Sequence, residues 1–373
     1  MKILVSAESF GYGPIATCLN VIKELIKYPD VIVDFIGSGI SLEQAKMSGY
    51  FNEFYECDTF DMVDLEKHKD VFLKYDIYFS SENINGAIFS LDYIKNVYYV
   101  DNLVWMWDEI PEKLGKVKKF FISETFSCKE NFDRVGHVID NPIFLGPVRN
   151  LKNSYKGKTK NQLIINLGGA SSFLFDQTII NKFYNKIINE ILSTNEINKF
   201  DKIIICGGSK VINNIKLDKE NDKVFIKTLS NEEYLKCMQE SSHCIMSSGL
   251  GNFIETINEN KNIMYLPAIN YSQMLQLNYY RKMDFGFDIL NWDNFNFYKE
   301  IPMYLDEKSG VDMVLENIKQ YLDYDYKESV NKIISKYLNS NQEKYFEKRN
   351  TYFNEFEKDA AFKIAKIIYE ENK

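Results

Sequence analysis

Short apolar runs alternate with segments of helical periodicity along most of the chain. Residues 3–6 form an apolar run that ends in a Gly-rich turn, and apolar side chains then recur at helical spacing from Ile15 to Ile26. Similar runs predict further strands at 31–37, 76–80, 97–100 and 120–123. Strands that alternate with helices predict a mostly parallel sheet that is covered by helices on both faces.

The alternation is interrupted once, near the middle of the chain. The segment 141–147 holds two prolines and a glycine, and the polar, Lys-rich run 150–161 that follows it is interpreted as an interdomain linker. A second alternation then begins, with strands predicted at 163–167, 202–206, 224–226, 244–246 and 263–266.

Two doubly wound, Rossmann-like α/β domains are therefore predicted, at 1–148 and 149–340. The last segment, 341–373, repeats aromatic and aliphatic residues at helical spacing and predicts a C-terminal helical tail. Simple packing explains its apolar residues, and packing back on the first domain stays open.

Composition narrows the class of protein. The 373 residues are 45% hydrophobic and 15% aromatic, which suffices for ordinary cores and argues against global disorder. The 45 Lys and Arg residues against 53 Asp and Glu residues give a net charge of −8, which argues against nucleic acid as a partner.

The cysteine pattern and the hydropathy of the chain indicate in which cellular compartment the protein is expected. The six cysteines and three histidines are scattered and include no CxxC pair, so we expect neither a zinc site nor a disulfide framework. The first residues contain too short an apolar run for a signal peptide, and no window approaches 18 uninterrupted apolar residues. The sequence predicts a cytoplasmic protein that does not span a membrane.

Three glycine-containing loops each directly follow a predicted strand of the second domain. Backbone N–H groups at the carboxyl ends of parallel strands, and at the helix N-termini that follow, favour anions. One such turn is more often structural, because glycine is common where a strand turns sharply, but three favour a nucleotide or phosphate site. The candidate residues are Gly169, Ser171, Gly208, Ser248, Gly249, Leu250 and Gly251.

Polar residues near the third loop suit a nucleotide sugar. Glu255 lies six residues after Gly249, close enough to accept hydrogen bonds from a ribose diol, although a solvated helix residue is the alternative. Neutral amides follow the next strand and suit sugar hydroxyls, although they also fit an ordinary Asn-rich loop. They are Asn270, Gln273, Gln276 and Asn278.

The segment Ser241–Glu255, followed by Pro267, Gln273 and Asn278, resembles the nucleotide-sugar signature of GT-B glycosyltransferases. It is most similar to the lipid-intermediate N-acetylglucosaminyltransferase family of peptidoglycan synthesis and to related nucleotide-sugar enzymes. The resemblance implies a GT-B fold, in which two Rossmann-like domains face a cleft and the C-terminal domain binds the donor.

The resemblance also implies roles for individual residues. Ser248 and Gly249 would bind the diphosphate, and Glu255 would hold the ribose. The loop that contains Leu229 would present its backbone to the base. Gln273 and Asn278 would contact the donor sugar, with Gln276 as a rival because the Gln spacing departs from that of the family.

The first domain resembles the family in Gly11, Tyr12 and Gly13, which are expected to line the acceptor site, and in Gly146-Pro147 at the domain junction. It departs at Pro14, where many relatives carry a histidine that touches the reacting groups. An inverting transfer needs a base to deprotonate the acceptor, and proline supplies none.

Several residues are candidates for that base. Glu8 is the first choice because it lies at the carboxyl end of a predicted strand, and Asp101, after the fourth strand, is the second. An exposed turn carboxylate is the alternative for Glu8. The remaining candidates are Asp108, Glu109 and His137.

Two tryptophans lie beside these carboxylates. Trp105 and Trp107 could stack on an acceptor ring, with core packing as the alternative. A third possibility is weak peripheral contact with a membrane surface, since the relatives use lipid-linked acceptors, but the lysines at 113–119 form only a modest basic cluster.

The sequence and the resemblance together predict a hexosyltransferase. It would move a sugar from a nucleoside-diphosphate sugar, with UDP as the expected carrier, to an unidentified acceptor across the interdomain cleft. No metal and no cofactor other than the donor substrate is expected, because backbone N–H groups can stabilise the diphosphate. A nucleotide-sugar hydrolase, an epimerase and a non-catalytic nucleotide-sugar-binding protein on the same fold remain alternatives.

Overall fold

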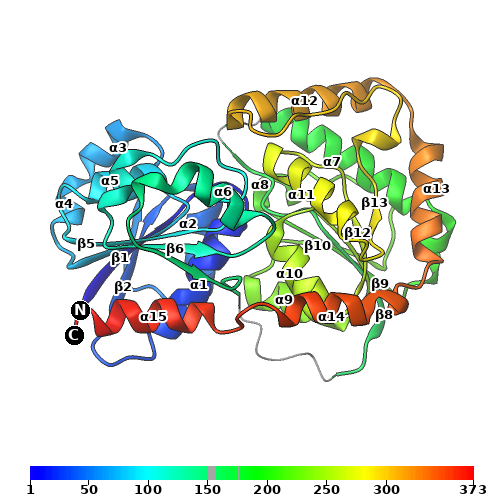
Figure 1. The fold of residues 1–373 in the computed structure, drawn as a ribbon. Coiled ribbons are helices and arrows are strands. Elements are labelled where there is room, and N and C mark those ends of the chain that lie inside the picture. The colour runs from blue at the N-terminus through cyan, green and yellow to red at the C-terminus, as the bar shows by residue number, and fades with distance from the viewer. Residues whose placement is uncertain (150–156, 173, 175) are drawn as a thin grey trace. The chain divides into compact units, whose positions relative to one another are not determined.

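The computed structural model describes residues 1–149, 157–172, 174 and 176–373, and these form two compact units (Figure 1). Unit 1 comprises Met1–Asn153 and Phe356–Lys373, and unit 2 comprises Ser154–Glu355. The chain therefore enters unit 1 twice. Each unit is built around a parallel sheet with helices on both faces, which confirms the predicted pair of Rossmann-like α/β domains.

The sheet of unit 1 has the order β3-β2-β1-β4-β5-β6-β7 in the described ranges, and its neighbouring strands are all parallel. The chain first builds outward from β1 to β3 and then returns to place β4 on the other side of β1. A topological switch point therefore lies between β1 and β4. The strands are β1 (Lys2–Ala7), β2 (Ile32–Gly37), β3 (Phe54–Glu56), β4 (Ile77–Ser81), β5 (Asn96–Asp101), β6 (Lys119–Ser123) and β7 (Pro142–Leu145).

Helices cover both faces of this sheet. On one face, Ile3 and Val5 of β1 pack with Ile22 of α1 and Ile364 of α15, and all four side chains are fully buried. On the other face, the ring of Phe72 lies 5.7 Å from that of Tyr78 on β4. The helices are α1 (Gly13–Leu25), α2 (Gly39–Ser48), α3 (Met62–Lys67), α4 (Lys69–Phe72), α5 (Ile84–Ser90), α6 (Cys128–Val135) and α15 (Ala360–Glu370), with 3₁₀ helices at Glu112–Lys116 and Gly136–Val138.

The interruption predicted at 141–147 is in fact part of the first sheet. Pro142–Leu145 forms β7, which pairs with β6. Proline is tolerated there because β7 is an edge strand and Pro142 is its first residue, where no ladder N–H is required. Of the predicted linker 150–161, residues 150–156 lie outside the described residues and Lys160 already begins β8.

The sheet of unit 2 has the order β10-β9-β8-β11-β12-β13 in the described part of the chain, again with parallel pairs. Here the chain builds outward from β8 to β10 and then crosses back to β11. A second switch point therefore lies between β8 and β11. The strands are β8 (Lys160–Asn166), β9 (Lys202–Cys206), β10 (Val224–Lys227), β11 (Ser241–Met246), β12 (Asn262–Tyr265) and β13 (Asp288–Ile289).

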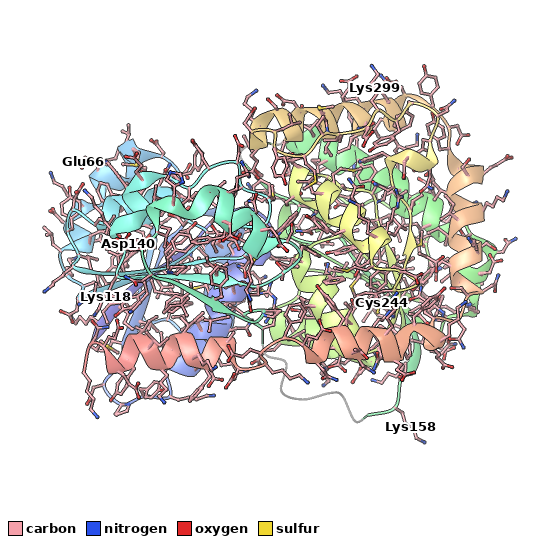
Figure 2. The ribbon with its side chains drawn as sticks, in the orientation of Figure 1. Glu66, Lys118, Asp140, Lys158, Cys244 and Lys299 are labelled. Atoms are coloured by element: carbon pink, nitrogen blue, oxygen red, sulfur yellow. The ribbon has the colours of Figure 1, made fainter. Side chains whose placement is uncertain are left out.

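The helices of unit 2 also lie on both sides of its sheet (Figure 1). Cys244 of β11, which Figure 2 labels inside unit 2, is fully buried between the layers. The helices are α7 (Gln177–Leu192), α8 (Ser209–Ile212), α9 (Asn231–Glu240), α10 (Leu250–Asn258), α11 (Tyr271–Lys282), α12 (Glu307–Asp323), α13 (Lys327–Leu338) and α14 (Phe346–Asn354), with 3₁₀ helices at Asn195–Lys199, Trp292–Asn294 and Glu343–Tyr345.

The C-terminal segment is divided between the two units. The guanidinium of Arg349 on α14 is buried and donates to the carbonyls of Phe285 and Lys261, which fixes α14 in unit 2. The following helix, α15, belongs to unit 1.

Contacts at both ends of this returning segment hold it in unit 1. The ring of Tyr369 stacks on that of Tyr28 with centroids 4.2 Å apart. A Cβ atom on Gly146 would lie 2.0 Å from the carbonyl oxygen of Glu357, so only glycine lets the two backbones approach this closely. In the described ranges, no helix is long and apolar enough to cross a membrane.

Candidate functional site

The three predicted glycine loops lie at the ends of three adjacent strands of unit 2, β9, β8 and β11. Backbone hydrogen bonds join them directly: Gly208 N–H donates to the Gly168 carbonyl at 2.9 Å, and Ser247 N–H donates to the Asn166 carbonyl at 2.7 Å. Gly168 and Ala170 have left-handed backbone, with φ of 68° and 47°. The loops after β8 and β11 flank the switch point, where ligands of open α/β sheets bind.

The N-terminus of α10 faces the same sheet edge. Gly249 is the N-cap, and no side chain in the described part of the chain caps the helix. A Cβ atom on Gly249 would meet no described atom within 4 Å. Because the first N–H groups of a helix lack partners inside the helix and carry its positive dipole end, those of Leu250 and Gly251 are available to an anion.

A buried network around Asn252 fixes the shape of these loops. Its amide nitrogen donates to the Ser247 carbonyl at 2.9 Å, and its amide oxygen accepts from Asn166 at 3.0 Å and from the Tyr234 hydroxyl at 2.7 Å. Asn252 thus joins β8, β11 and α9. The sequence assigned no role to Asn252, although its position in the first turn of the helix after the third glycine loop could be predicted.

Other residues predicted to contact the nucleotide are less open than expected. Ser248 is fully buried, and its hydroxyl donates to the Gln273 carbonyl at 3.4 Å, so it ties α11 to the loop instead of facing outward. Ser171 and Leu229 are each only 5% exposed. Gly169 and Gly208 are buried. Any contribution from these two glycines comes through the backbone.

Glu255 lies in the second turn of α10 and is 9% exposed. Its carboxylate lies near the buried Tyr234: burial first, and then the charge of Glu255, raise the pKa of the Tyr234 hydroxyl. Glu255 therefore belongs to the same loop cluster as Asn252, and the reading of it as a solvated helix residue does not hold.

The predicted sugar-binding amides differ in how they are used. The side-chain oxygen of Asn270 caps α11 by accepting from Gln273 N–H at 2.8 Å, and the side-chain oxygen of Gln273 accepts from Ile269 N–H at 3.0 Å. Gln276 is 3% exposed, and its amide oxygen has no hydrogen-bond partner among the described residues. The amide oxygen of Gln273 is thus engaged by a backbone N–H, whereas that of the buried Gln276 is not engaged in the described part of the chain. Asn278, on the same helix, is half-buried.

In unit 1, Glu8 and Glu82 flank the switch point. Glu8 follows β1 and accepts from the Asn83 amide at 3.3 Å, and Glu82 follows β4 with left-handed backbone, φ 56°. Asp101 ends the neighbouring strand β5. After burial, the charges of Asp101, Glu82 and Glu8 all contribute to a raised pKa of the Tyr99 hydroxyl, which places the three carboxyl groups around one ring.

Burial raises the pKa of both Glu82 and Asp101, but their other neighbours affect the two pKa values differently. Burial, and then the charge of Asp101, raise the pKa of Glu82 to about 8. Burial raises the pKa of Asp101 to about 6, and hydrogen bonds from Leu103 N–H and Trp107 limit the rise. Glu82 therefore keeps its proton to higher pH than Asp101 does. Such a pair can supply one general acid and one general base.

Glu82 is the functional candidate that sequence reasoning missed. It follows the predicted strand 76–80 by two residues, the same position relative to a strand that pointed to Glu8. A chain of polar side chains holds it: Asn102 donates to Glu82 and to the Thr17 hydroxyl, and Arg149 donates to Thr17 at 2.8 Å. The charge of Arg149 also lowers the pKa of Glu82 and so limits its rise.

The predicted acceptor platform is corrected in part. Trp105 is fully buried and meets Phe126 edge to face at 5.0 Å, so it packs in the core and offers no ring face to a substrate. Trp107 is half-buried, and its indole N–H binds Asp101. The glycine turn is open: in the described ranges, a Cβ on Gly11 or Gly13 would meet nothing within 4 Å.

The remaining residues predicted for unit 1 do not join the carboxyl cluster. Tyr12 is half-buried and is the N-cap of α1. Asp108 is exposed and pairs with Arg134 at 3.4 Å. Glu109 and His137 are exposed as well, and neither is placed with the buried carboxyl groups.

Comparison with solved structures gives matches along the whole chain at low sequence identity. S. aureus MnaA with UDP aligns at a TM-score of 0.52 and 12% identity, covering 100% of this chain and 97% of that one. MurG of Acinetobacter baumannii aligns at 0.51 and 11%, covering 99% of each chain. The glycotransferase of kitacinnamycin aligns at 0.50 and 10%, covering 99% of this chain and 98% of that one.

Neither protein-family profiles nor curated protein sequences give a match. At 10–12% identity, the structural likeness concerns the fold. The resemblance to the GT-B fold, which the sequence indicated, is confirmed: the chain has the two Rossmann-like domains of MurG and related proteins.

Proposed function

We propose that this protein is a glycosyltransferase that takes a sugar from a nucleoside-diphosphate sugar. Unit 2 binds the donor, with UDP as the carrier, and unit 1 supplies the acid and base. The observation that carries the proposal is the coincidence of chemistry with topology: the open N-terminus of α10 and the glycine loops lie at one switch point, and Glu8 and Glu82 lie at the other.

The donor would be bound through the backbone of unit 2. Gly249, Leu250 and Gly251 present N–H groups where the diphosphate charge grows as the sugar leaves. No metal is needed at the diphosphate in this proposal, because these N–H groups and the dipole of α10 stabilise the charge. That S. aureus MnaA, which shares the fold, was solved with UDP supports this choice of ligand.

Glu255 would bind the ribose. An ionised carboxylate accepts two hydrogen bonds from a vicinal diol, and Glu255 lies on the helix whose N-terminus would bind the phosphates. Gln276, whose amide oxygen has no hydrogen-bond partner within the described ranges, would accept a hydrogen bond from a hydroxyl of the donor sugar.

Asp101 is the proposed base that deprotonates the acceptor, and Glu82 the proposed acid. Their pKa values, about 6 and about 8, mean that Glu82 keeps its proton to higher pH than Asp101 does. A base whose pKa lies close to the working pH combines adequate basicity with the correct protonation state. Glu8, the first choice from sequence, is kept as the group that orients the edge through Asn83.

Binding of the donor can be tested by titrating the full chain with UDP and with 2′-deoxy-UDP by calorimetry. We expect the deoxy analogue to bind the unmodified protein at least about 10-fold more weakly, because a charge-assisted hydrogen bond is lost. In Glu255→Gln this difference should shrink, so the double comparison isolates the diol contact. Failure of UDP and of thymidine diphosphate to bind at all would contradict the donor site.

A nucleotide-sugar hydrolase or epimerase is the second candidate. The pair of Glu82 and Asp101, with its two different pKa values, favours it too, because removing and returning a proton at a sugar carbon needs both an acid and a base. Incubation with UDP-sugars in the absence of an acceptor separates the candidates. Rapid release of UDP, or incorporation of solvent deuterium into the sugar, would favour this second candidate over the transferase.

A further inference from the structure

Cys57, Asp64 and His68 meet at one edge of unit 1 and are not part of the carboxyl cluster described above. The Cys57 sulfur, a carboxylate oxygen of Asp64 and a ring nitrogen of His68 all lie within 4.8 Å of one another. Glu66, which Figure 2 labels, lies on α3, the helix that carries Asp64. We propose that these three side chains form a zinc-binding site.

Local structure holds the three ligands together. Cys57 is the first residue after β3, and its N–H donates to the Gly37 carbonyl at 3.1 Å. Asp64 and His68 are four residues apart, on one side of α3 and its C-cap. The loop between Cys57 and Asp64 is closed by the N–H of Asp58, which donates to the Asp64 carboxylate at 2.8 Å. The ligands are therefore preorganised by backbone contacts.

The hydrogen bonding of His68 prepares its ring for a metal. Nδ1 of His68 lies 2.8 Å from the Asp64 carbonyl oxygen. Because a carbonyl can only accept, Nδ1 is the ring nitrogen that donates in this bond, and Nε2 is the nitrogen that a metal could use. Histidines that ligate metals are commonly oriented by such a bond from the other ring nitrogen.

The ligand types select the metal. Thiolate, imidazole and carboxylate together suit Zn²⁺, whereas Mg²⁺ and Ca²⁺ take oxygen ligands. Tetrahedral zinc places its ligand atoms roughly 3.5 Å apart, so small side-chain rotations would close the site. Three protein ligands leave the fourth position to water.

The local charge also favours a cation. The carboxylates of Asp64, Asp58 and Asp61 surround Cys57 with negative charge. Burial first, and then these charges, raise the pKa of the Cys57 thiol, so zinc would displace the thiol proton when it binds. Lys67, which approaches Asp64 at 3.4 Å, is 66% exposed and can turn into solvent when a cation binds.

The proposed site is linked to the carboxyl cluster. Thr59, in the loop between the ligands, accepts from the amide of Asn83, and that amide also donates to Glu8 at 3.3 Å. Bound zinc would therefore fix the loop that holds Asn83, at the edge where Glu8 and Glu82 lie. The role we assign to the metal is to order this loop.

Binding of zinc to the full, tag-free chain tests the proposal. After treatment with a chelator, the protein is titrated with Zn²⁺ in competition with a chromophoric chelator, and then with Co²⁺ as a spectroscopic probe. We expect about one equivalent per chain, the intense visible bands of tetrahedral cobalt, and a near-ultraviolet thiolate-to-cobalt band. Mg²⁺ in excess should not compete. A chain that retains no zinc above a buffer blank would overturn the proposal.

Variants of the three ligands locate the metal. Cys57→Ser and His68→Gln should each weaken zinc binding by at least about 100-fold, and Cys57→Ser should also abolish the thiolate band. The matched controls are Cys128→Ser, a buried cysteine of the same unit, and His137→Gln, an exposed histidine. If Cys57→Ser does not fold, Asp64→Asn and His68→Gln, which change half-buried side chains, carry the test. Zinc retained equally by ligand and control variants would place it elsewhere and refute the site.

Discussion

The indole N–H of Trp107 donates to both carboxylate oxygens of Asp101, with Nε1 to oxygen distances of 3.1 and 2.9 Å. A hydrogen bond to the ionised form lowers a carboxyl pKa, and here it offsets part of the rise that burial causes. The ring that sequence reasoning assigned to acceptor stacking therefore tunes the proposed base.

Replacing Trp107 with Phe removes this N–H and keeps a ring. We expect the pKa of Asp101 to rise above about 6, because the ionised form loses a donor while burial remains. The acid limb of the pH profile of sugar turnover should move to higher pH, while turnover on its plateau changes little. If the acid limb does not move, Asp101 is not the catalytic base.

Glu82→Gln should stabilise the protein in alkaline conditions. The folded-state pKa of Glu82, about 8, lies above the unfolded value near 4.5, so the folded chain binds the additional proton between these limits. Stability is therefore lost as the pH rises through this range, and glutamine removes the loss. Each pKa unit corresponds to about 1.4 kcal/mol, so above pH 8 we expect a gain of up to about 5 kcal/mol, and at pH 4 almost none.

Thermal melts of both proteins at several pH values measure this difference, with a shift of roughly 2–4 °C per kcal/mol for a chain of this class. The same substitution should lower sugar turnover by about 100-fold, because the proposed acid is lost. Glu109→Gln, at an exposed carboxylate, is the control and should change neither quantity. If the substitution shifts the melting temperature equally at every pH, the raised pKa of Glu82 is not the cause of the shift.

Gly249→Ala should weaken the binding of UDP without lowering the stability of the fold. The φ of Gly249 is −64°, which alanine adopts freely, and the added methyl would meet no described atom. The methyl group would stand at the N-terminus of α10, where the diphosphate is proposed to bind. We expect about a 10-fold or greater loss in UDP affinity by calorimetry with an unchanged melting temperature.

Gly13→Ala is its counterpart in unit 1, with equally open space in the described structure. It should leave both UDP affinity and the melting temperature unaltered. Equal effects of the two substitutions on UDP would argue against a donor site in unit 2.

Asn252→Leu should destabilise unit 2. It leaves the buried partners of Asn252 on Ser247, Asn166 and Tyr234 without their hydrogen bonds, at a cost of roughly 2–4 kcal/mol. Denaturant unfolding measures this cost. Asn278→Ala, on a half-buried side chain of the same unit, should cost less than about 1 kcal/mol. Similar values for both would mean that the network contributes little.

The alternation of apolar runs predicted most of the central strands, because strands buried on both faces leave a strong signal. The strands it missed are short: β3 has three residues and β13 has two. At β7, Pro142 was taken as a break, although an edge strand can begin with proline. Edge strands need little apolar sequence, so pattern alone does not reveal them.

The candidate site was predictable where glycine marks the backbone and less so where geometry is set by distant partners. The loops at Gly168, Gly208 and Gly249 could be found from the sequence. Glu82 could not be ranked, because its left-handed backbone and its contact with Asn102 depend on the neighbouring strand. Cys57 and His68 are eleven positions apart, and only the turn into α3 brings them together.

The return of α15 to unit 1 affects the order in which the two units can fold during synthesis. A ribosome makes β1 and α1 first, yet the apolar side chains of α1 that pack against Ile364 and Ile368 stay uncovered until residues 360–370 have been translated. Unit 2, which is made in between, holds its whole core in one continuous stretch. We therefore expect the half that is synthesised first to finish folding last, and a nascent chain that stalls after α14 to present a ready surface to chaperones.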